Sequence, residues 1–92
     1  MEWAVTIGRQ ALKQVPRLPK TARKALIALF AEMEAHGPVR GNWSNYGSLG
    51  GSQHHCHIKK GQPTYVAVWK TIDKERRIIE VIYVGTHENA PY

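Results

Sequence analysis

Residues 54–61, with the sequence HHCHIKKG, bring together side chains that could do chemistry. They include three of the five histidines, the only cysteine and two adjacent lysines. Imidazole exchanges protons near neutral pH, lysine supplies positive charge, and both imidazole and thiolate bind metal ions. Three kinds of site are compatible with this set: a metal site, a strip that contacts nucleic acid, and part of an active site that cleaves a phosphodiester.

A metal site is the weakest of the three. Residues 54–60 have the alternation of a strand, which directs Cys56 and Ile58 to one face and His55, His57 and Lys59 to the other. Zinc requires about four converging ligands, and only His55 and His57 share a face. We therefore expect no metal and no cofactor, and we expect Cys56 to pack in the core beside Ile58 rather than act as a nucleophile.

RNA cleavage without a metal needs a base for the 2′-OH, a cation for the phosphate and an acid for the 5′-oxygen. His57 and Lys59, two positions apart on one strand face, would supply a proton carrier and a cation to the same phosphate. His87, which follows the last expected strand, could approach them, and Tyr92 offers a ring or a hydroxyl. An ordinary solvated strand face is the alternative, and the spacing alone does not decide between the two.

The charge of the chain favours a polyanionic partner. The 92 residues carry 13 Lys and Arg against 7 Asp and Glu, a formal net charge of +6. A run without any acidic residue precedes and enters the second expected helix: Arg9, Lys13, Arg17, Lys20, Arg23 and Lys24. Such a strip suits phosphate backbones or an acidic protein.

The periodicity of the chain predicts an α+β fold. A short strand (3–7) precedes a helix that ends at the prolines of residues 15–19, and a second helix ends at Gly37. A Gly-, Ser- and Asn-rich loop spans residues 39–53, where Trp43 and Tyr46 are either base-stacking platforms or, as we favour, anchors on the core. Three strands follow, at residues 54–60, 64–72 and 78–84.

The expected architecture is β-α-α-β-β-β in one domain over residues 1–92. A two-helix hairpin would pack on one face of a mainly antiparallel, four-stranded sheet. The longest apolar run is too short to span a bilayer, and one cysteine allows no internal disulfide. We expect a cytoplasmic protein without a membrane partner.

Over essentially its whole length the chain resembles the RelE/ParE superfamily of small bacterial toxins from type II toxin–antitoxin systems. The resemblance lies in the element order, in LPK between the helices, in CHIKKG at the start of the sheet, and in the ending IIEVIYVGTHENAPY. CHI, the late histidine and the terminal aromatic are most similar to the ribosome-dependent mRNA endonucleases RelE and YafQ.

The resemblance implies an mRNA interferase that cuts in the ribosomal A site and leaves a 2′,3′-cyclic phosphate. It implies catalytic roles for His57, Lys59, His87 and Tyr92, and partners in mRNA, the ribosome and a DNA-binding cognate antitoxin. The residues expected to contact RNA are Lys60, His55, Arg77, Lys20, Arg23 and Lys24.

Two positions depart from the family pattern. Val66 stands where RelE-type members have an arginine, and Lys60-Gly61 stands where YafQ-like members have an acidic residue. Two alternatives to the nuclease also stay open. One is a ParE-like toxin that inhibits DNA gyrase without cutting nucleic acid, and the other is a degenerate homologue that only binds its antitoxin.

Overall fold

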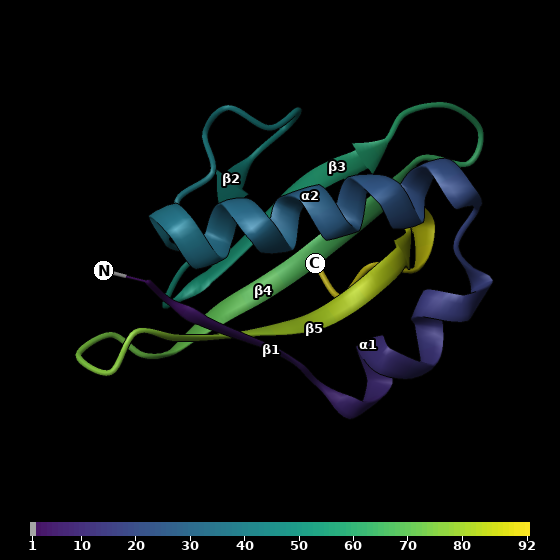
Figure 1. Cartoon of the computed structure of the whole chain (residues 1–92). Helices are drawn as coiled ribbons and strands as arrows, with labels where there is room; N and C mark the ends of the chain where they lie inside the picture. Colours follow the sequence, from purple (N-terminus) through teal and green to yellow (C-terminus); the bar gives the residue numbers. More distant parts are fainter. Residues whose placement is uncertain (1) are drawn as a thin grey trace.

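Within the part of the chain that the structure describes, residues 2–92, five strands form one sheet with helices against one face (Figure 1). The structure is a computed structural model. The sheet has the order β1-β5-β4-β3-β2; β1 is parallel to β5, and the other neighbours are antiparallel. The strands are β1 (Ala4–Ile7), β2 (Gly47–Ser48), β3 (Gln53–Lys59), β4 (Tyr65–Asp73) and β5 (Ile78–Thr86).

The predicted α+β class is therefore confirmed, but the prediction of four strands is wrong. The fifth strand, β2, comes from the glycine-rich stretch that the sequence indicates as a loop. It has two residues, a glycine and a serine, so it carries no apolar alternation that could mark it. Its extended form comes from pairing with His54 and His55 of β3, which is a tertiary interaction.

Proline and glycine set the limits of the helices. Helix α1 (Arg9–Gln14) runs into a 3₁₀ turn, η1 (Val15–Arg17), which contains Pro16. Helix α2 (Lys20–His36) begins after Pro19 and ends at Gly37, whose φ of 92° and N–H bond to the Met33 carbonyl close the last turn. A second 3₁₀ turn, η2 (His87–Asn89), follows β5.

The main core lies between α2 and the sheet. On α2 the buried residues recur at helical spacing, and on β3 and β4 the residues that face this core occupy alternate positions, whereas on β5 the step from Val81 to Val84 crosses an irregularity in the register. Cys56 and Ile58 are buried here, 0% and 7% exposed. Burial raises the pKa of Cys56 to about 12, which suits a core residue and not a nucleophile. The buried members are Ala11, Leu18, Ala22, Leu26, Leu29, Met33, Cys56, Ile58, Ala67, Trp69, Ile79, Val81 and Val84.

A smaller apolar cluster lies on the other face of the sheet. Val66 and Val68 of β4 pack there with Tyr83 of β5, against the partly buried Leu49 and Ala90. Ala90 belongs to the C-terminal segment, so this segment folds back over the sheet, and Figure 1 shows the C-terminus near the middle of the sheet. None of the helices in residues 2–92 has the length and apolar character needed to cross a membrane.

Candidate active site

Two histidines that lie thirty positions apart in the sequence meet at one end of the sheet. The rings of His57, on β3, and His87, in η2, have centroids 5.5 Å apart and are nearly perpendicular. β5, the strand that precedes His87, pairs with β4 and is not a neighbour of β3, the strand that carries His57. His87 reaches His57 because η2 passes over the end of β4, where the His87 N–H donates to the Thr64 carbonyl at 2.8 Å.

An open cavity of about 580 Å³ lies beside this histidine pair. The cavity is within the size range of sites that bind small ligands or single nucleotides. The β3–β4 turn forms one wall and η2 forms the other. The Thr64 hydroxyl donates to the Gly61 carbonyl at 2.8 Å and so stabilises the turn. The lining residues are His57, Gly61, Gln62, Pro63, Thr64, His87 and Glu88.

The ring of Tyr92 contacts both His87, a member of this pair, and a third histidine, His55. Its ring lies 4.5 Å from that of His55 and 5.8 Å, edge-on, from that of His87. His55 is confined on its other side, since its Nε2 lies 2.9 Å from where a Cβ on Gly47 would be. Its Nδ1 is buried without a hydrogen-bond partner. We call His55, His57, His87 and Tyr92 the histidine cluster.

The environment favours the uncharged forms of His55, His57 and Tyr92. Burial lowers the pKa of His57, and the positive charges of His87, His55 and Lys60 lower it further. Burial, followed by the charge of His87, lowers the pKa of His55 as well. Burial raises the pKa of Tyr92, which keeps its hydroxyl protonated. Near neutral pH the cluster therefore presents neutral imidazoles on β3 and a phenol that can donate a proton.

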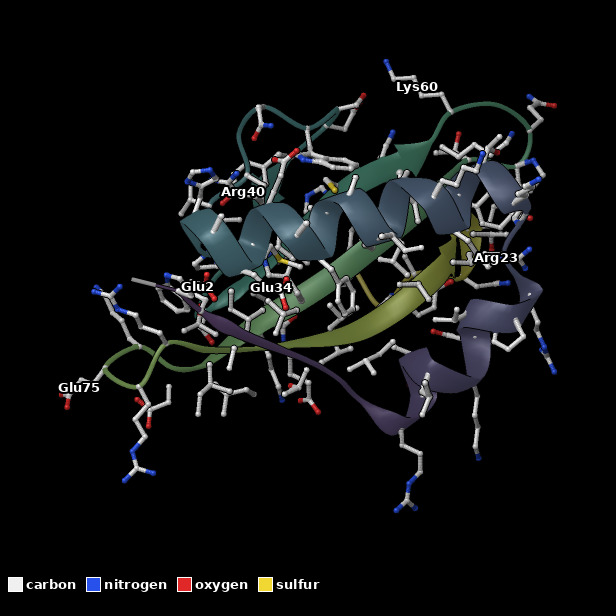
Figure 2. The ribbon with its side chains drawn as sticks, in the orientation of Figure 1. Glu2, Arg23, Glu34, Arg40, Lys60 and Glu75 are labelled. Atoms are coloured by element: carbon white, nitrogen blue, oxygen red, sulfur yellow. The ribbon has the colours of Figure 1, made fainter. Side chains whose placement is uncertain are left out.

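Lys59 and Lys60 precede the β3–β4 turn that forms one wall of the cavity. The β3–β4 register shifts between His57 and Lys59, which marks a β-bulge, although Cys56 and Ile58 both stay on the buried face as the sequence predicts. The Lys59 ammonium lies 3.7 Å from the Cβ position of Gly61, a residue that lines the cavity. Lys60 is exposed and points away from the sheet (Figure 2), although its charge acts on His57.

The remaining residues that we predicted to contact RNA fall into two groups. Lys20, Arg23 and Lys24 lie on the first turns of α2, at the same end of the molecule as the β3–β4 turn (Figure 1). The Arg23 guanidinium donates to the Leu18 carbonyl at 3.0 Å, which places it at the start of the helix. Arg77 instead precedes β5, and the length of that strand puts it roughly 25 Å from His87.

Sequence reasoning missed three polar residues of the cavity, Gln62, Thr64 and Glu88. Glu88 could have been found from its position next to His87. Gln62 and Thr64 lie in a stretch that indicates only a turn, and nothing in their types marks a site.

The loop aromatics behave as anchors, as we favoured. Trp43 and Tyr46 pack against the main core. The Trp43 indole donates to Glu32, and the Tyr46 hydroxyl lies 2.7 Å from His54 Nδ1. His54 stacks on Trp69 with ring centroids 5.9 Å apart. Within residues 2–92 no three His, Cys, Asp or Glu side chains converge as a metal site requires.

Comparison with known proteins identifies the fold. No family model and no curated protein matches the sequence. Solved structures do match. One is a chain of the intact E. coli RelBE toxin–antitoxin complex, at 25% identity and a TM-score of 0.69 over 95% of this chain and 99% of that one.

Two further solved structures have a similar fold. A mutant of the E. coli toxin RelE in the free state matches at 23% identity and a TM-score of 0.72, over 98% of this chain and 88% of that one. The YoeB dimer from Staphylococcus aureus matches at 15% identity and a TM-score of 0.71, over 95% and 99%. The resemblance seen in the sequence motifs is thus confirmed in the fold.

Proposed function

We propose that this chain, which has the fold of the RelE-like toxins, is the toxin of a type II toxin–antitoxin system and cleaves mRNA. The observation that supports this most directly is the contact between His57 and His87 at the edge of an open cavity. Two imidazoles within reach of one ligand can share the base and acid steps of a phosphodiester cleavage. The cavity opens at the end of the molecule that carries the basic first turns of α2.

In the proposed reaction His57 is the base and His87 the acid. Neutral His57 removes the proton of the 2′-OH, and the 2′-oxygen attacks phosphorus. The bond to the 5′-oxygen breaks, and protonated His87 gives that oxygen its proton, so the products are a 2′,3′-cyclic phosphate and a 5′-hydroxyl. The lowered pKa of His57 supports this assignment, because a base must be unprotonated before it acts.

The remaining roles belong to Lys59, Lys60 and Tyr92. Val66, which pairs with His57 across the ladder, is fully buried and uncharged, so we assign the positive charge at the phosphate to Lys59, with Lys60. The Tyr92 ring, 45% exposed beside His55 and His87, is placed to stack on a base of the substrate.

The proposed partners follow from the same likeness. The E. coli and Pyrococcus horikoshii relatives are described in complexes of RelE with RelB. We propose a cognate, DNA-binding antitoxin for this chain, and mRNA on the cytoplasmic ribosome as its target. The net charge of +6 fits both a polyanionic substrate and an acidic antitoxin segment.

Primer extension on an mRNA, incubated with the purified protein with and without translating ribosomes, tests the proposal. We expect new cuts at in-frame codons. His57→Ala and His87→Ala should each slow cleavage by about 10²–10⁴-fold, the usual contribution of a general acid or base. His36→Ala is the matched control, because His36 lies at the far end of α2, and its cleavage should equal that of the unmodified protein.

A second substrate checks the chemistry. An mRNA with a 2′-deoxy nucleotide at the cleaved position lacks the nucleophile and should stay intact. Its cleavage would rule out the 2′-OH mechanism. If the normal message also stays intact while DNA gyrase loses supercoiling activity, the ParE-like alternative replaces this proposal.

A further inference from the structure

Glu32, on α2, is hydrogen-bonded to the loop that follows this helix. One of its carboxylate oxygens, Oε1, accepts three hydrogen bonds from the segment that follows the helix. The donors are the Arg40 guanidinium at 3.1 Å, the Asn42 amide at 2.9 Å and the Trp43 indole at 2.9 Å. These contacts lower the pKa of Glu32, so the carboxylate is charged near neutral pH and its hydrogen bonds are charge-assisted.

The three donors to Glu32 belong to residues 40–48, which we call the edge segment. It lies along the outer edge of β3. The Ser44 carbonyl accepts the His57 N–H at 2.8 Å, and Gly47 pairs with His55. The Tyr46 hydroxyl bonds to His54. The edge segment therefore contacts every histidine of β3.

An edge strand needs such a cover, because its outward N–H and C=O groups otherwise stay open. β2 supplies only two paired residues, and the bond from His57 to Ser44 extends the cover further along β3. The edge segment has little regular structure of its own, and Asn45 has a φ of 54°. Ordering it costs conformational entropy, which attachment to Glu32 offsets.

We infer that Glu32 is a positioning residue for the histidine cluster. Its carboxylate holds the edge segment against β3, and the edge segment in turn holds the backbone of His57 and confines the ring of His55. The effect on catalysis rests on the proposed function. The effect of Glu32 on the position of the edge segment does not depend on the proposed function, and it can be measured separately.

Gly47 is part of the same arrangement. A Cβ there would lie 2.9 Å from Nε2 of His55, so only glycine lets the edge segment approach this closely. With the segment in place, His55 and His57 are half-buried. Releasing the segment would leave both rings free to change rotamer, without removing any group that touches the substrate.

Amide hydrogen exchange measured by NMR tests the inference directly. In Glu32→Ala the His57 amide should exchange about tenfold faster or more, relative to the amide of Val68 in the central strand, because local release of the edge segment exposes it. Trp43→Phe keeps an apolar ring on the core and removes one donor, so it should shift the ratio in the same direction by less.

Glu34→Ala is the matched control. Glu34 lies on the same helix, its side chain makes no hydrogen bond within residues 2–92, and Figure 2 shows it on the other side of α2 from Arg40. Its His57-to-Val68 exchange ratio should equal that of the unmodified protein. In cleavage assays Glu32→Ala should lower kcat severalfold with little change in KM, and Glu34→Ala should change neither.

Two outcomes overturn the inference. In one, the His57 amide keeps its protection in Glu32→Ala. In the other, His57 and Val68 lose protection equally, which would mean that Glu32 only supports global stability. If the unmodified protein cleaves no RNA while the exchange ratio shifts as expected, the proposed function fails and the positioning role of Glu32 stands.

Discussion

At the scale of single residues, the protonation of His57 controls the proposed reaction. Its ring is half-buried, and the nearest charges that act on it are positive, so every cause that lowers its pKa acts in the same direction. A pKa below the ordinary value of 6.5 means that the imidazole stays neutral as the pH falls through 6.5. Cleavage should therefore persist on the acid side of neutrality and decline only when His57 becomes protonated.

Replacing Lys60 tests this electrostatic account. In Lys60→Gln one of the positive charges that lower the pKa of His57 is gone, so that pKa should rise and the acid limb of the pH–rate profile should move to higher pH. Titration of the His57 ring protons by NMR measures the change in the free protein. Lys74→Gln, in the β4–β5 turn, carries the same charge change and should leave the titration of His57 unmoved. Equal curves for Lys60→Gln and the unmodified protein would contradict the account.

At the scale of elements, the end of β5 determines where His87 lies. The Tyr83 hydroxyl donates to the Thr86 carbonyl at 2.8 Å, one residue before His87. The Tyr83 ring lies over Gly85, where a Cβ would come within 2.7 Å of the hydroxyl oxygen. Gly85 therefore leaves room for Tyr83 to hold the strand end from which η2 starts.

Gly85→Ala should disturb this strand end. Tyr83 has to move, its bond to Thr86 breaks, and His87 shifts away from His57. We expect the free energy of unfolding to fall by about 1–3 kcal/mol, as in other overpacked sites, together with reduced cleavage. Urea unfolding and primer extension measure the two effects. Gly41→Ala is the control, since no atom lies within 4 Å of its Cβ position, and unchanged behaviour of Gly85→Ala would refute the role of Tyr83.

The sequence predicts those elements whose side chains carry a pattern. The alternation of Cys56 and Ile58 correctly identifies the buried face of β3, and the apolar spacing up to Met33 correctly identifies α2. The two residues of β2 carry no pattern that could predict a strand, since their extended conformation depends on pairing with β3.

In the candidate site, too, the residue types could be predicted from the sequence, and the contacts that depend on the tertiary fold could not. His57 and His87 are found from residue type and from their places next to strands, whereas their contact depends on η2 crossing the end of β4. Arg77, which we expected to contact RNA together with the other cations, lies at the opposite end of β5. The three bonds to Glu32 could not be predicted either, since they depend on how a loop folds back on a helix.

At the scale of the whole molecule, the excess of positive charge should govern binding to RNA. Affinity for a single strand falls with salt, with a slope in log affinity against log salt of about −0.7 for each phosphate that the protein neutralises. We expect Lys20→Gln combined with Lys24→Gln to make this slope shallower by about 0.7 for each phosphate that these two lysines neutralise. Arg23 is left in place because its guanidinium also bonds to Leu18.

Fluorescence anisotropy of a short RNA, blocked against cleavage by 2′-deoxy substitution, measures these slopes across a salt series. Lys74→Gln is again the control, because it lies at the other end of the sheet from the cavity. Parallel slopes for the double variant and the unmodified protein would mean that the first turns of α2 do not touch the RNA backbone.

The return of the C-terminal segment over the sheet has a practical consequence for work with this protein. Tyr92 lies against both His55 and His87, so any polypeptide attached after it, such as a purification tag or a fluorescent fusion, begins beside the histidine cluster. The start of β1 lies at the other end of β5, where Ala4 pairs with Ile78. Reporters and affinity handles are therefore best placed before β1, because a polypeptide attached after Tyr92 would crowd the histidine cluster and should lower any cleavage that depends on it.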